Sequence, residues 1–469
     1  MPEQFSSLSF RDPDGRVHIV DNRVFRFLRE SIASPVVGFV TSAAAQKLVA
    51  SHQLISSARR SIEEIPASIS EPGQWLEHER IWFSSFPFEW APEMLHAAGV
   101  LTLTVAEAAL LEGVELKDAT PFNVLFSGSQ PVFIDVASIQ RMNSRQLTWH
   151  AYAQFVQSFV LPLLAHRITG MRMEWIFSVK RDGLAPSDLQ HLPGVWRFRA
   201  GRRYVLLPRL FADEKSAKPA AAVKKEHDAE VSTYVRRRLY SGLRRDLRSL
   251  FPREPSRSDV TEYRVARAQE EAEQTAAKLG QVKDWLKVLK PRRVLDIGAN
   301  TGDYSLVAAR LGARVVAIDK VPEAISVLYR RCRSESADIQ PLVVDLMRPT
   351  PPVGWMNAEH KSFVERARGQ FDTILVLAVI HHVVINDRVP VRHLLELLAD
   401  LTASNLLIEF VAREDPNFVR VARGRDQLFL DYTKEAFESE AARFFRIESQ
   451  LELTGGTRTL YLMRKERNS

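Results

Sequence analysis

Acidic residues and a glycine-rich turn follow successive apolar segments in the second half of the chain. The first segment runs into the stretch VLDIGANTGDYSL, where Asp296 precedes a turn that contains Gly298 and Gly302. Asp319 and Asp345 come after the next two apolar segments. Glycine lets the backbone turn sharply and approach a ligand, and a helix that begins at the turn directs free N–H groups toward it. The pattern therefore predicts a binding site for a small ligand.

The turn does not fit a dinucleotide-binding loop. That fingerprint requires glycine at position 300 and a small residue at position 303, where the chain has Asn300 and Asp303. An aspartate at the mouth of a pyrophosphate site would repel the ligand. A dinucleotide site is therefore excluded.

The pattern D-x-G-x-N-x-G instead resembles motif I of the class I S-adenosylmethionine-dependent methyltransferases, D/E-x-G-x-G-x-G. The resemblance implies that Gly298, Asn300 and Gly302 form the loop that holds the amino-acid end of S-adenosyl-L-methionine. The ammonium and sulfonium charges of this cofactor suit a nearby acid, here Asp296. Asn300 departs from the middle glycine, but asparagine tolerates unusual backbone angles better than most residues.

The spacing of the later segments supports the same cofactor site, over roughly residues 275–465. Asp319 ends the second strand, where a carboxylate can accept hydrogen bonds from both ribose hydroxyls. The resemblance places Asp345 near the adenine amino group, and Leu377 and Ala378 follow the fourth strand at the point where such sheets bind ligands. Each acid is also compatible with a simple capping role, but three acids in succession behind a glycine loop favour a site.

The methyl acceptor is expected over the carboxyl ends of strands four and five, near His381, His382, Glu409 and Tyr432. Methyl transfer from a sulfonium is an in-line displacement that requires an aligned acceptor and removal of its proton, and it requires no metal. His382 is the first candidate for the general base, because histidine titrates near neutral pH. The histidine pair is equally compatible with packing on the cofactor, and Glu409 with satisfying a buried donor.

Regular alternation of apolar strands and helices from about residue 259 predicts an α/β fold. Continuous apolar strands separated by helix-length segments indicate a parallel sheet buried on both faces. Gly455-Gly456 lies between two strand-like segments and predicts a two-residue hairpin turn. With the resemblance, this gives a Rossmann-like seven-stranded sheet that ends in an antiparallel hairpin.

A second set of polar residues that could do chemistry lies in the first half of the chain, around the stretch LKDATPFNVLF. Its members, in chain order, are Asp118, Asn123 and Asp135. These residues resemble the catalytic-loop acid and the two metal ligands of the kinase-like superfamily. No G-x-G precedes them, however, and Lys47 lies in a helical pattern rather than on a strand. Without a phosphate cradle, little would position ATP for transfer. We expect an α+β kinase-like scaffold that is degenerate, with an active kinase as the alternative.

Three segments resemble a bacterial family of two-part proteins that includes the rhizobial nodulation protein NoeA. They are the segment from FPFEW to DVASI and the shorter segments LIEFVAREDPNF and TRTLYL. In that family a segment of this kind precedes a methyltransferase domain. The resemblance implies a role in host-specific nodulation or in making a modified bacterial metabolite. A likeness of fold does not identify the substrate.

Composition divides the chain into a kinase-like domain over 1–212, a basic linker over 213–258 and a methyltransferase domain over 259–469. Twelve Lys/Arg against five Asp/Glu between Lys215 and Ser258 account for the whole net charge of +7. This basic stretch is compatible with a solvated linker or with a contact for RNA or another polyanion. Aromatic residues that would stack on bases are sparse there, which disfavours nucleic acid.

Cellular location and partners follow from composition and the start of the sequence. The N-terminus lacks the pattern of a secretory signal, and no apolar run approaches the length of a membrane span. The single cysteine, Cys332, excludes a disulfide framework and a multi-cysteine zinc site. We expect a cytoplasmic methyltransferase that acts on a small-molecule or carbohydrate-type acceptor. The alternatives are an RNA or protein methyltransferase and a non-catalytic cofactor-binding regulatory protein.

Overall fold

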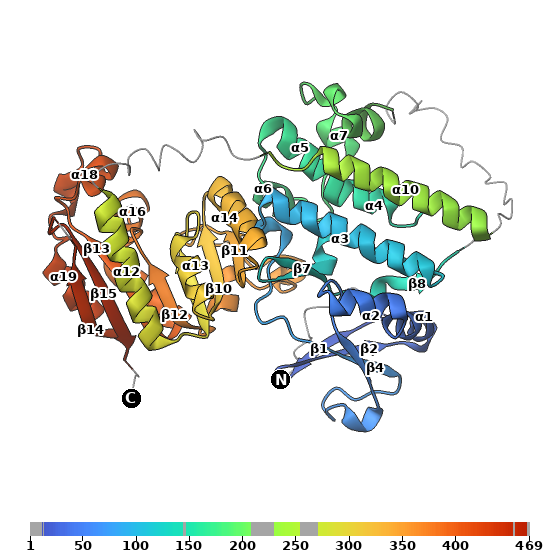
Figure 1. The fold of residues 1–469 in the computed structure, drawn as a ribbon, viewed down its shortest axis with the longest axis horizontal. Helices are drawn as coiled ribbons and strands as arrows, with labels where there is room; N and C mark the ends of the chain where they lie inside the picture. The colour runs from blue at the N-terminus through green and yellow to red at the C-terminus, as the bar shows by residue number, and fades with distance from the viewer. Residues whose placement is uncertain are drawn as a thin grey trace. The chain divides into compact units, whose positions relative to one another are not determined.

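A computed structural model describes residues 12, 14–143, 147–207, 229–253, 271–453 and 455–466. The chain forms two compact units (Figure 1). The first comprises Met1–Arg253 with Val353–His360, and the second comprises Glu254–Pro352 with Lys361–Ser469.

The first unit begins with a four-stranded antiparallel sheet in the order β1-β2-β4-β3. Two helices, α1 and α2, separate β2 from β3 along the chain (Figure 1). The bounds are β1 Val17–Val20, β2 Arg23–Leu28, α1 Glu30–Val40, α2 Ala43–Ala50, β3 Ser57–Arg60 and β4 Gln74–His78. Phe25, Phe27 and Trp75 form a core cluster on this sheet.

Helices and two short antiparallel ladders complete the first unit. The ladders pair β5 with β8 and β6 with β7, and the turn between β6 and β7 follows the predicted DATPFN stretch. Their bounds are β5 Val114–Leu116, β6 Val124–Ser127, β7 Gln130–Phe133 and β8 Ile139–Arg141. The helices are α3 Pro92–Leu111, α4 Tyr152–Phe155, α5 Leu161–Thr169, α6 Met173–Phe177, α7 Pro186–Leu189, α8 Arg199–Gly201 and α10 Ala229–Ser249. This unit is α+β.

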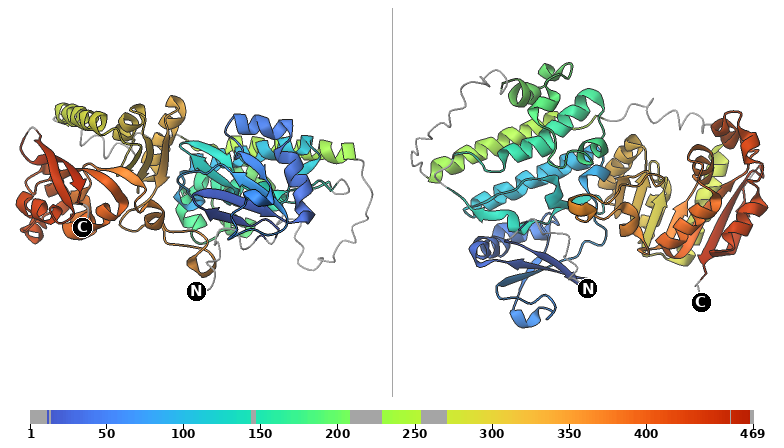
Figure 2. Two further views of the ribbon diagram at one scale, coloured as in Figure 1. Left: turned by 90° about the horizontal axis from the view of Figure 1, so that it is seen from below. Right: turned by 180° about the vertical axis from the view of Figure 1, so that it is seen from behind.

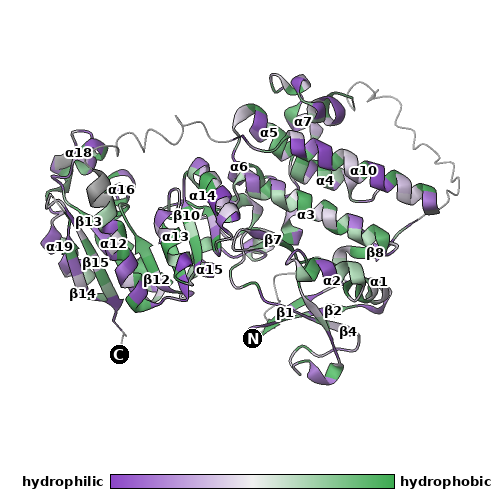
Figure 3. Cartoon of the chain, in the orientation of Figure 1, coloured by the Kyte–Doolittle hydropathy of each residue, from purple (hydrophilic) through white to green (hydrophobic). Residues whose placement is uncertain are grey.

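Helix α3 corrects the expectation that no apolar run reaches the length of a membrane span. An 18-residue stretch of this 20-residue helix has a mean hydropathy of 1.7, so α3 is the one helix in the described ranges that is long and apolar enough to cross a membrane; α1 and α2 would be so only as a bent pair. However, 61% of that stretch is buried within the protein, and α3 packs against α2, α5, α10 and β7. The apolar surface of α3 thus forms the centre of the first unit (Figure 3).

Helix α10 corrects the middle of the predicted basic linker over 213–258. It belongs to the first unit, where Tyr240, Leu243 and Leu247 are fully buried. Arg236 forms a buried ion pair with Glu115 at 3.0 Å, and Arg244 pairs with Glu107 at 2.7 Å. Composition alone suggested a solvated run of charge, because six arginines lie among the apolar residues of α10. The rest of the predicted linker, except for residues 250–253, lies outside the described residues.

The second unit contains a seven-stranded sheet in the order β11-β10-β9-β12-β13-β15-β14. The first five strands of this order pair in parallel, and β15 pairs antiparallel with both β13 and β14. The strands are β9 Arg293–Ile297, β10 Arg314–Asp319, β11 Ile339–Val343, β12 Phe371–Val376, β13 Thr402–Val411, β14 Phe445–Glu452 and β15 Arg458–Lys465. The predicted α/β sheet with a terminal hairpin is confirmed.

Helices cover both faces of this sheet, which explains why its central strands are continuously apolar. Helices α12, α13 and α14 lie on one face and α17 on the other (Figures 1 and 2). Strand β12 is accordingly buried along almost its whole length. The helices are α12 Glu271–Leu289, α13 Asp303–Arg310, α14 Pro322–Glu335, α15 Phe363–Ala367, α16 Ile380–Asn386, α17 Val391–Leu401, α18 Pro416–Ala422 and α19 Lys434–Ala441.

The hairpin connection is longer than the two-residue turn that Gly455-Gly456 suggested. Strand β14 ends at Glu452 and β15 begins at Arg458. The N–H of Leu453 donates to the carbonyl of Arg458 at 2.9 Å, and both glycines have positive φ. The glycines therefore mark the correct place, within a loop rather than a tight turn.

We predict that the buried Arg236–Glu115 pair holds α10 in the first unit. Arg236→Met leaves Glu115 buried and unpaired, and should lower the free energy of unfolding by about 3–5 kcal/mol. Urea unfolding can be followed by far-ultraviolet circular dichroism and by tryptophan fluorescence, to which Trp149 contributes; its ring lies 5.1 Å from that of Tyr240 on α10.

The double variant Arg236→Met/Glu115→Gln should lose less stability than Arg236→Met alone. Arg238→Met, at an exposed position of the same helix, serves as the control and should change little. Equal losses at positions 236 and 238 would contradict the assignment of α10 to the core.

Candidate active site

The glycine loop between β9 and α13 has backbone angles that few residues adopt. Gly298, Asn300 and Gly302 have φ values of 73°, 51° and 86°. A Cβ atom on Gly298 would lie 2.4 Å from Cγ2 of Val379, and one on Gly302 would lie 2.1 Å from Cδ1 of Leu328. Both glycines are therefore required by conformation and by space. Asn300 takes the left-handed conformation that asparagine tolerates.

Asp319 at the end of β10 anchors this loop. Its Oδ2 accepts the N–H of Asn300 at 2.9 Å, and its Oδ1 accepts the N–H of Val321 at 2.9 Å. The N–H groups of Gly298 and Ala299 donate to the carbonyl of Ile318 at 2.9 and 3.0 Å. Burial raises the pKa of Asp319, while the backbone donors lower it. Each carboxylate oxygen keeps a second lone pair for a ligand hydroxyl.

Asp296 lies in the middle of the sheet at the tip of β9. Its carboxyl group is 2% exposed, and Ser305 on α13 donates to its Oδ2 at 2.6 Å. Burial raises the pKa of Asp296 to about 6, and the hydrogen bond from Ser305 opposes that shift. A buried acid of this kind gains from a cationic ligand, because the opposite charge stabilises its ionised form.

Asp345 follows β11 and already has partners within the protein. Its Oδ1 accepts the N–H of Met347 at 3.0 Å, and Arg348 pairs with both Asp345 at 3.1 Å and Asp387 at 2.8 Å. This is the capping geometry that the sequence left open as an alternative. The carboxylate is partly exposed and keeps acceptor capacity, so a contact with adenine stays a prediction.

The segment after β12 lies against the glycine loop. Leu377 is buried, and Ala378 has a φ of 57°, which is uncommon for a residue with a Cβ atom. The neighbouring Val379 makes the close approach to Gly298 described above. The structure therefore brings together the residues that the sequence placed after β9, β10 and β12.

His381 and His382 form a ring pair at the start of α16, with centroids 4.2 Å apart. Burial lowers the pKa of His381 far below its usual value, and its Nδ1 has no hydrogen-bond partner among the described residues. Burial, aided by Lys320 and Arg420, lowers the pKa of His382 to about 4. Both rings are therefore neutral at pH 7. His382 is the more exposed of the two and the better placed to accept a proton.

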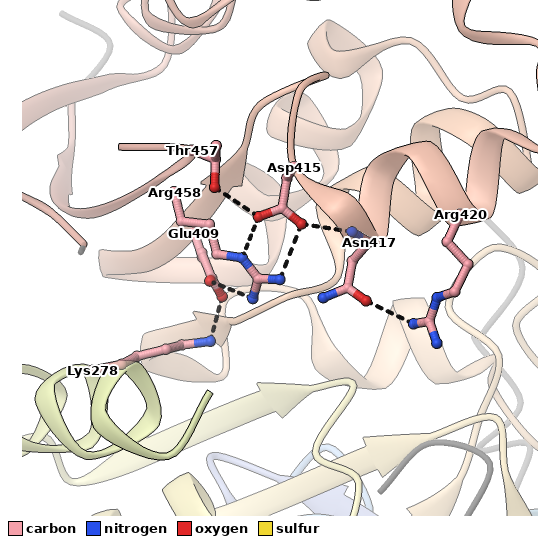
Figure 4. A network of polar contacts seen from close by, with 7 residues as sticks. All are labelled: Lys278, Glu409, Asp415, Asn417, Arg420, Thr457 and Arg458. Atoms are coloured by element: carbon pink, nitrogen blue, oxygen red, sulfur yellow. Dashed lines mark hydrogen bonds and ion pairs between the residues drawn. The ribbon is translucent and has the colours of Figure 1, made fainter. Parts of the chain in front are cut away.

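Glu409 is fully buried on β13 and is paired with two cations (Figure 4). Nζ of Lys278 on α12 bonds to its Oε2, and Nη1 of Arg458 on β15 lies 3.5 Å from its Oε1. Of the two roles left open from the sequence, this geometry fits the satisfaction of buried donors. A general base must reach the methyl acceptor, and Glu409 is fully buried between its two cations, so its position does not fit the predicted catalytic role.

The Glu409 pairs continue into a chain of alternating charges that sequence reasoning missed. Arg458 donates to both oxygens of Asp415, at 2.7 and 3.1 Å (Figure 4). Asp415 also accepts the Thr457 hydroxyl at 2.9 Å and caps α18 through the N–H of Asn417. One signal was available: Lys278 lies four residues before Val282, on the apolar face of its helix.

Tyr432, expected near the acceptor, lies in an aromatic cluster. Its ring stacks on Phe410 and Phe418, with centroids 5.0 and 5.4 Å away. Burial raises the pKa of Tyr432. The side chain is 7% exposed, so its position fits packing better than proton transfer.

The polar residues of the first unit converge, with a cation that was not predicted. Arg26 on β2 forms an ion pair with Asp135 at 3.1 Å and donates to Nε2 of His78 at 3.2 Å. Asn123 donates to the carbonyl of Asp118 at 3.3 Å, and burial together with the charge of Asp118 raises the pKa of Asp135 while Arg26 lowers it. The sequence offered no lysine on a strand near these acids, and Arg26 on β2 supplies the cation instead.

The fold and this site define the second unit as a methyltransferase domain. Residues 236–454 match the family model described as "Methyltransferase domain", a match that begins within α10. The domain is that of an enzyme whose cofactor is S-adenosyl-L-methionine, and the buried acid and crowded glycine loop fit a cationic cofactor.

Relatives extend the likeness to the whole chain. The chain is 28% identical over 473 residues to the nodulation protein NoeA of Rhizobium meliloti, covering 97% of this chain and 94% of NoeA. It is 29% identical over 181 residues to the O-antigen chain terminator bifunctional methyltransferase/kinase WbdD of Escherichia coli, covering 38% of this chain and 23% of WbdD. The solved N-methyltransferase NodS of Bradyrhizobium japonicum aligns with 42% of this chain at 15% identity and a TM-score of 0.32.

We predict a pH dependence of stability that arises from Asp296. The pKa of about 6 in the folded chain exceeds the unfolded value, so the folded chain keeps a proton that the unfolded chain has released. The contribution of Asp296 to the free energy of unfolding should therefore fall by roughly 3 kcal/mol as pH rises from about 4 to 6. His381 and His382, whose pKa values are lowered, contribute in the opposite direction over this range, so the contribution of Asp296 is read as the difference between wild type and a variant. Denaturant titrations at several pH values measure this slope.

Asp296→Asn should remove this contribution, because it carries no titrating carboxyl group, so its free energy of unfolding relative to wild type should change by roughly 3 kcal/mol between pH 4 and pH 6. Asp284→Asn, at an exposed position of α12, is the control and should keep the slope. If wild type and Asp296→Asn show the same pH dependence, Asp296 does not titrate as described.

Proposed function

We propose that the protein transfers a methyl group from S-adenosyl-L-methionine to a small-molecule or carbohydrate-type acceptor. The observation that carries the proposed site is the glycine loop held by Asp319 beside the buried acid Asp296. In this proposal Asp296 attracts the cationic amino-acid end of the cofactor, and Asp319 accepts hydrogen bonds from the ribose. Asp345 lies near the adenine amino group, and Leu377 and Ala378 line the cofactor site after β12.

The bound cofactor supplies an activated methyl group on a positively charged sulfur. The task of the chain is to align an acceptor atom over β12 and β13 and to take up its proton. His382 is the proposed base, since its ring is neutral at pH 7 and is the more exposed of the histidine pair. Its pKa of about 4 makes it a weak base, which suits an acceptor that acquires acidity as the new bond forms.

The names of the relatives support a carbohydrate-type acceptor. WbdD is named as a chain terminator of O-antigen, and NoeA as a nodulation protein. A role in host-specific nodulation is therefore our proposal for this chain, together with a cytoplasmic location. The alternative of an RNA methyltransferase depended on the basic stretch, but Arg236 and Arg244 in that stretch are ion-paired within the first unit.

For the first unit we propose a kinase-like scaffold without phosphotransfer. Its four-stranded sheet, the helix α3 and the site of Asp118, Asn123 and Asp135 follow the order expected for that scaffold. The partial similarity to WbdD, a methyltransferase/kinase by name, supports the likeness. The ion pair between Arg26 and Asp135 argues against a metal-dependent kinase, because the arginine neutralises the carboxylate that would hold the metal.

The proposed methyl transfer is tested with radiolabelled S-adenosyl-L-methionine and extracts of a producing cell. Wild type should bind the cofactor and transfer label to an extractable species. Gly298→Arg should abolish binding, because a side chain there collides with Val379 and the residue needs positive φ. Gly280→Arg introduces the same side chain on α12 where nothing lies within 4 Å, and should bind as wild type does.

Each outcome selects among the functions considered. Equal binding by wild type and Gly298→Arg would refute the cofactor site. Tight binding with no labelled product would favour a non-catalytic regulatory protein, and label in RNA or protein would favour that alternative acceptor.

A thermal-shift measurement tests the proposal for the first unit. ATP with magnesium should leave the melting temperature of wild type unchanged, since Arg26 already neutralises Asp135. A stabilisation that is lost in Asp135→Ala would instead establish nucleotide binding and reopen the kinase alternative.

A further inference from the structure

Lys278 is a buried cation at a point where several parts of the candidate site meet. Its side chain extends from α12, is 4% exposed and bonds to Glu409 on β13 (Figure 4). Its Nζ also lies 5.2 Å from the centroid of the Tyr304 ring, in the first turn of α13 after the glycine loop. Its charge acts on Asp296, opposing the effect of burial on that acid's pKa, and on His381.

The carboxylate group of the cofactor is best stabilised by a cation, and the residues predicted from the sequence include none. The amino-acid end of S-adenosyl-L-methionine carries an ammonium group and a carboxylate group. The residues predicted from the sequence are acids, neutral histidines and apolar or small residues, which suit the ammonium and the sulfonium. Backbone N–H groups at the start of α13 can donate to a carboxylate, but a hydrogen-bonded cation stabilises a carboxylate that is withdrawn from water more strongly.

We propose that Lys278 binds the carboxylate of S-adenosyl-L-methionine, and that Glu409 and Arg458 are positioning residues for its side chain. The inference rests on the proposed cofactor site in the second unit. An ammonium group has three N–H donors, so Lys278 can keep its bond to Glu409 and donate to a ligand as well.

The chain of charges explains how Lys278 is held. The backbone of Glu409 is fixed, because it lies within β13 between β12 and β15, and its side chain is fully buried. Nη1 of Arg458 forms an ion pair with the other oxygen of Glu409 at 3.5 Å, and the guanidinium is itself held by two hydrogen bonds to Asp415. The lysine ammonium is therefore directed by a rigid set of partners, as a charged ligand site requires.

Three ligands separate a carboxylate contact from a general effect on the pocket. S-adenosyl-L-methionine carries the carboxylate, decarboxylated S-adenosylmethionine lacks only that group, and 5′-methylthioadenosine lacks the whole amino-acid end. Isothermal titration of the full chain with each ligand gives three dissociation constants. Wild type should prefer S-adenosyl-L-methionine over the decarboxylated form by about 10- to 100-fold.

The double variant Lys278→Met/Glu409→Gln removes the cation without leaving a buried unpaired acid. It should bind the two sulfonium ligands with nearly equal affinity and bind 5′-methylthioadenosine as wild type does. Lys278→Arg keeps the charge and should retain the preference. Circular dichroism and melting temperature identify variants that fail to fold.

Two results would overturn the assignment of Lys278. The first is equal affinity of wild type for S-adenosyl-L-methionine and its decarboxylated form, a comparison that requires no variant. The second is an equal loss of all three ligands in the folded double variant, which would indicate a purely structural lysine. Failure of wild type to bind any of the three would instead refute the cofactor site itself.

Discussion

The candidate site depends on the hydrogen bonds by which Asp319 and the end of β10 fix the glycine loop. Three successive residues, from Gly298 to Asn300, donate their N–H groups to the end of β10, the last of them to Asp319 itself. This hold keeps the loop in a conformation that only glycine, or asparagine at one position, adopts readily. The parallel order of β9, β10 and β12 then places Asp296 and the residues after β12 beside the same loop.

Two buried acids in the sheet of the second unit differ in their partners. Asp296 lies in the sheet with one hydroxyl donor and a raised pKa, whereas Glu409 lies in the same sheet between two cations. The first acid is suited to a cationic ligand, and the second is already neutralised. In the first unit, Asp135 resembles Glu409 in this respect, because it is paired with a cation, Arg26, rather than left to bind a metal ion. These carboxylates thus differ in their expected function through the partners that the fold supplies.

The sequence was sufficient to predict the parts of the structure that repeat along the chain. Apolar strands, the Gly298–Gly302 loop and the terminal hairpin follow from local pattern, and the structure has all three. Partners from distant segments could not be predicted in the same way. Arg26 lies more than a hundred residues from Asp135, and Lys278 lies 131 residues from Glu409. Helix α10 was missed because its basic residues concealed the burial of Tyr240 and Leu247.

A crystal structure of the protein grown with S-adenosyl-L-homocysteine tests the central claim most directly. The account predicts ligand density over residues 298–302, with the ribose hydroxyls within hydrogen-bond distance of Asp319 and the amino-acid end beside Asp296. Density for the ligand at another place in the second unit, with Asp319 contacting only the loop, would contradict it.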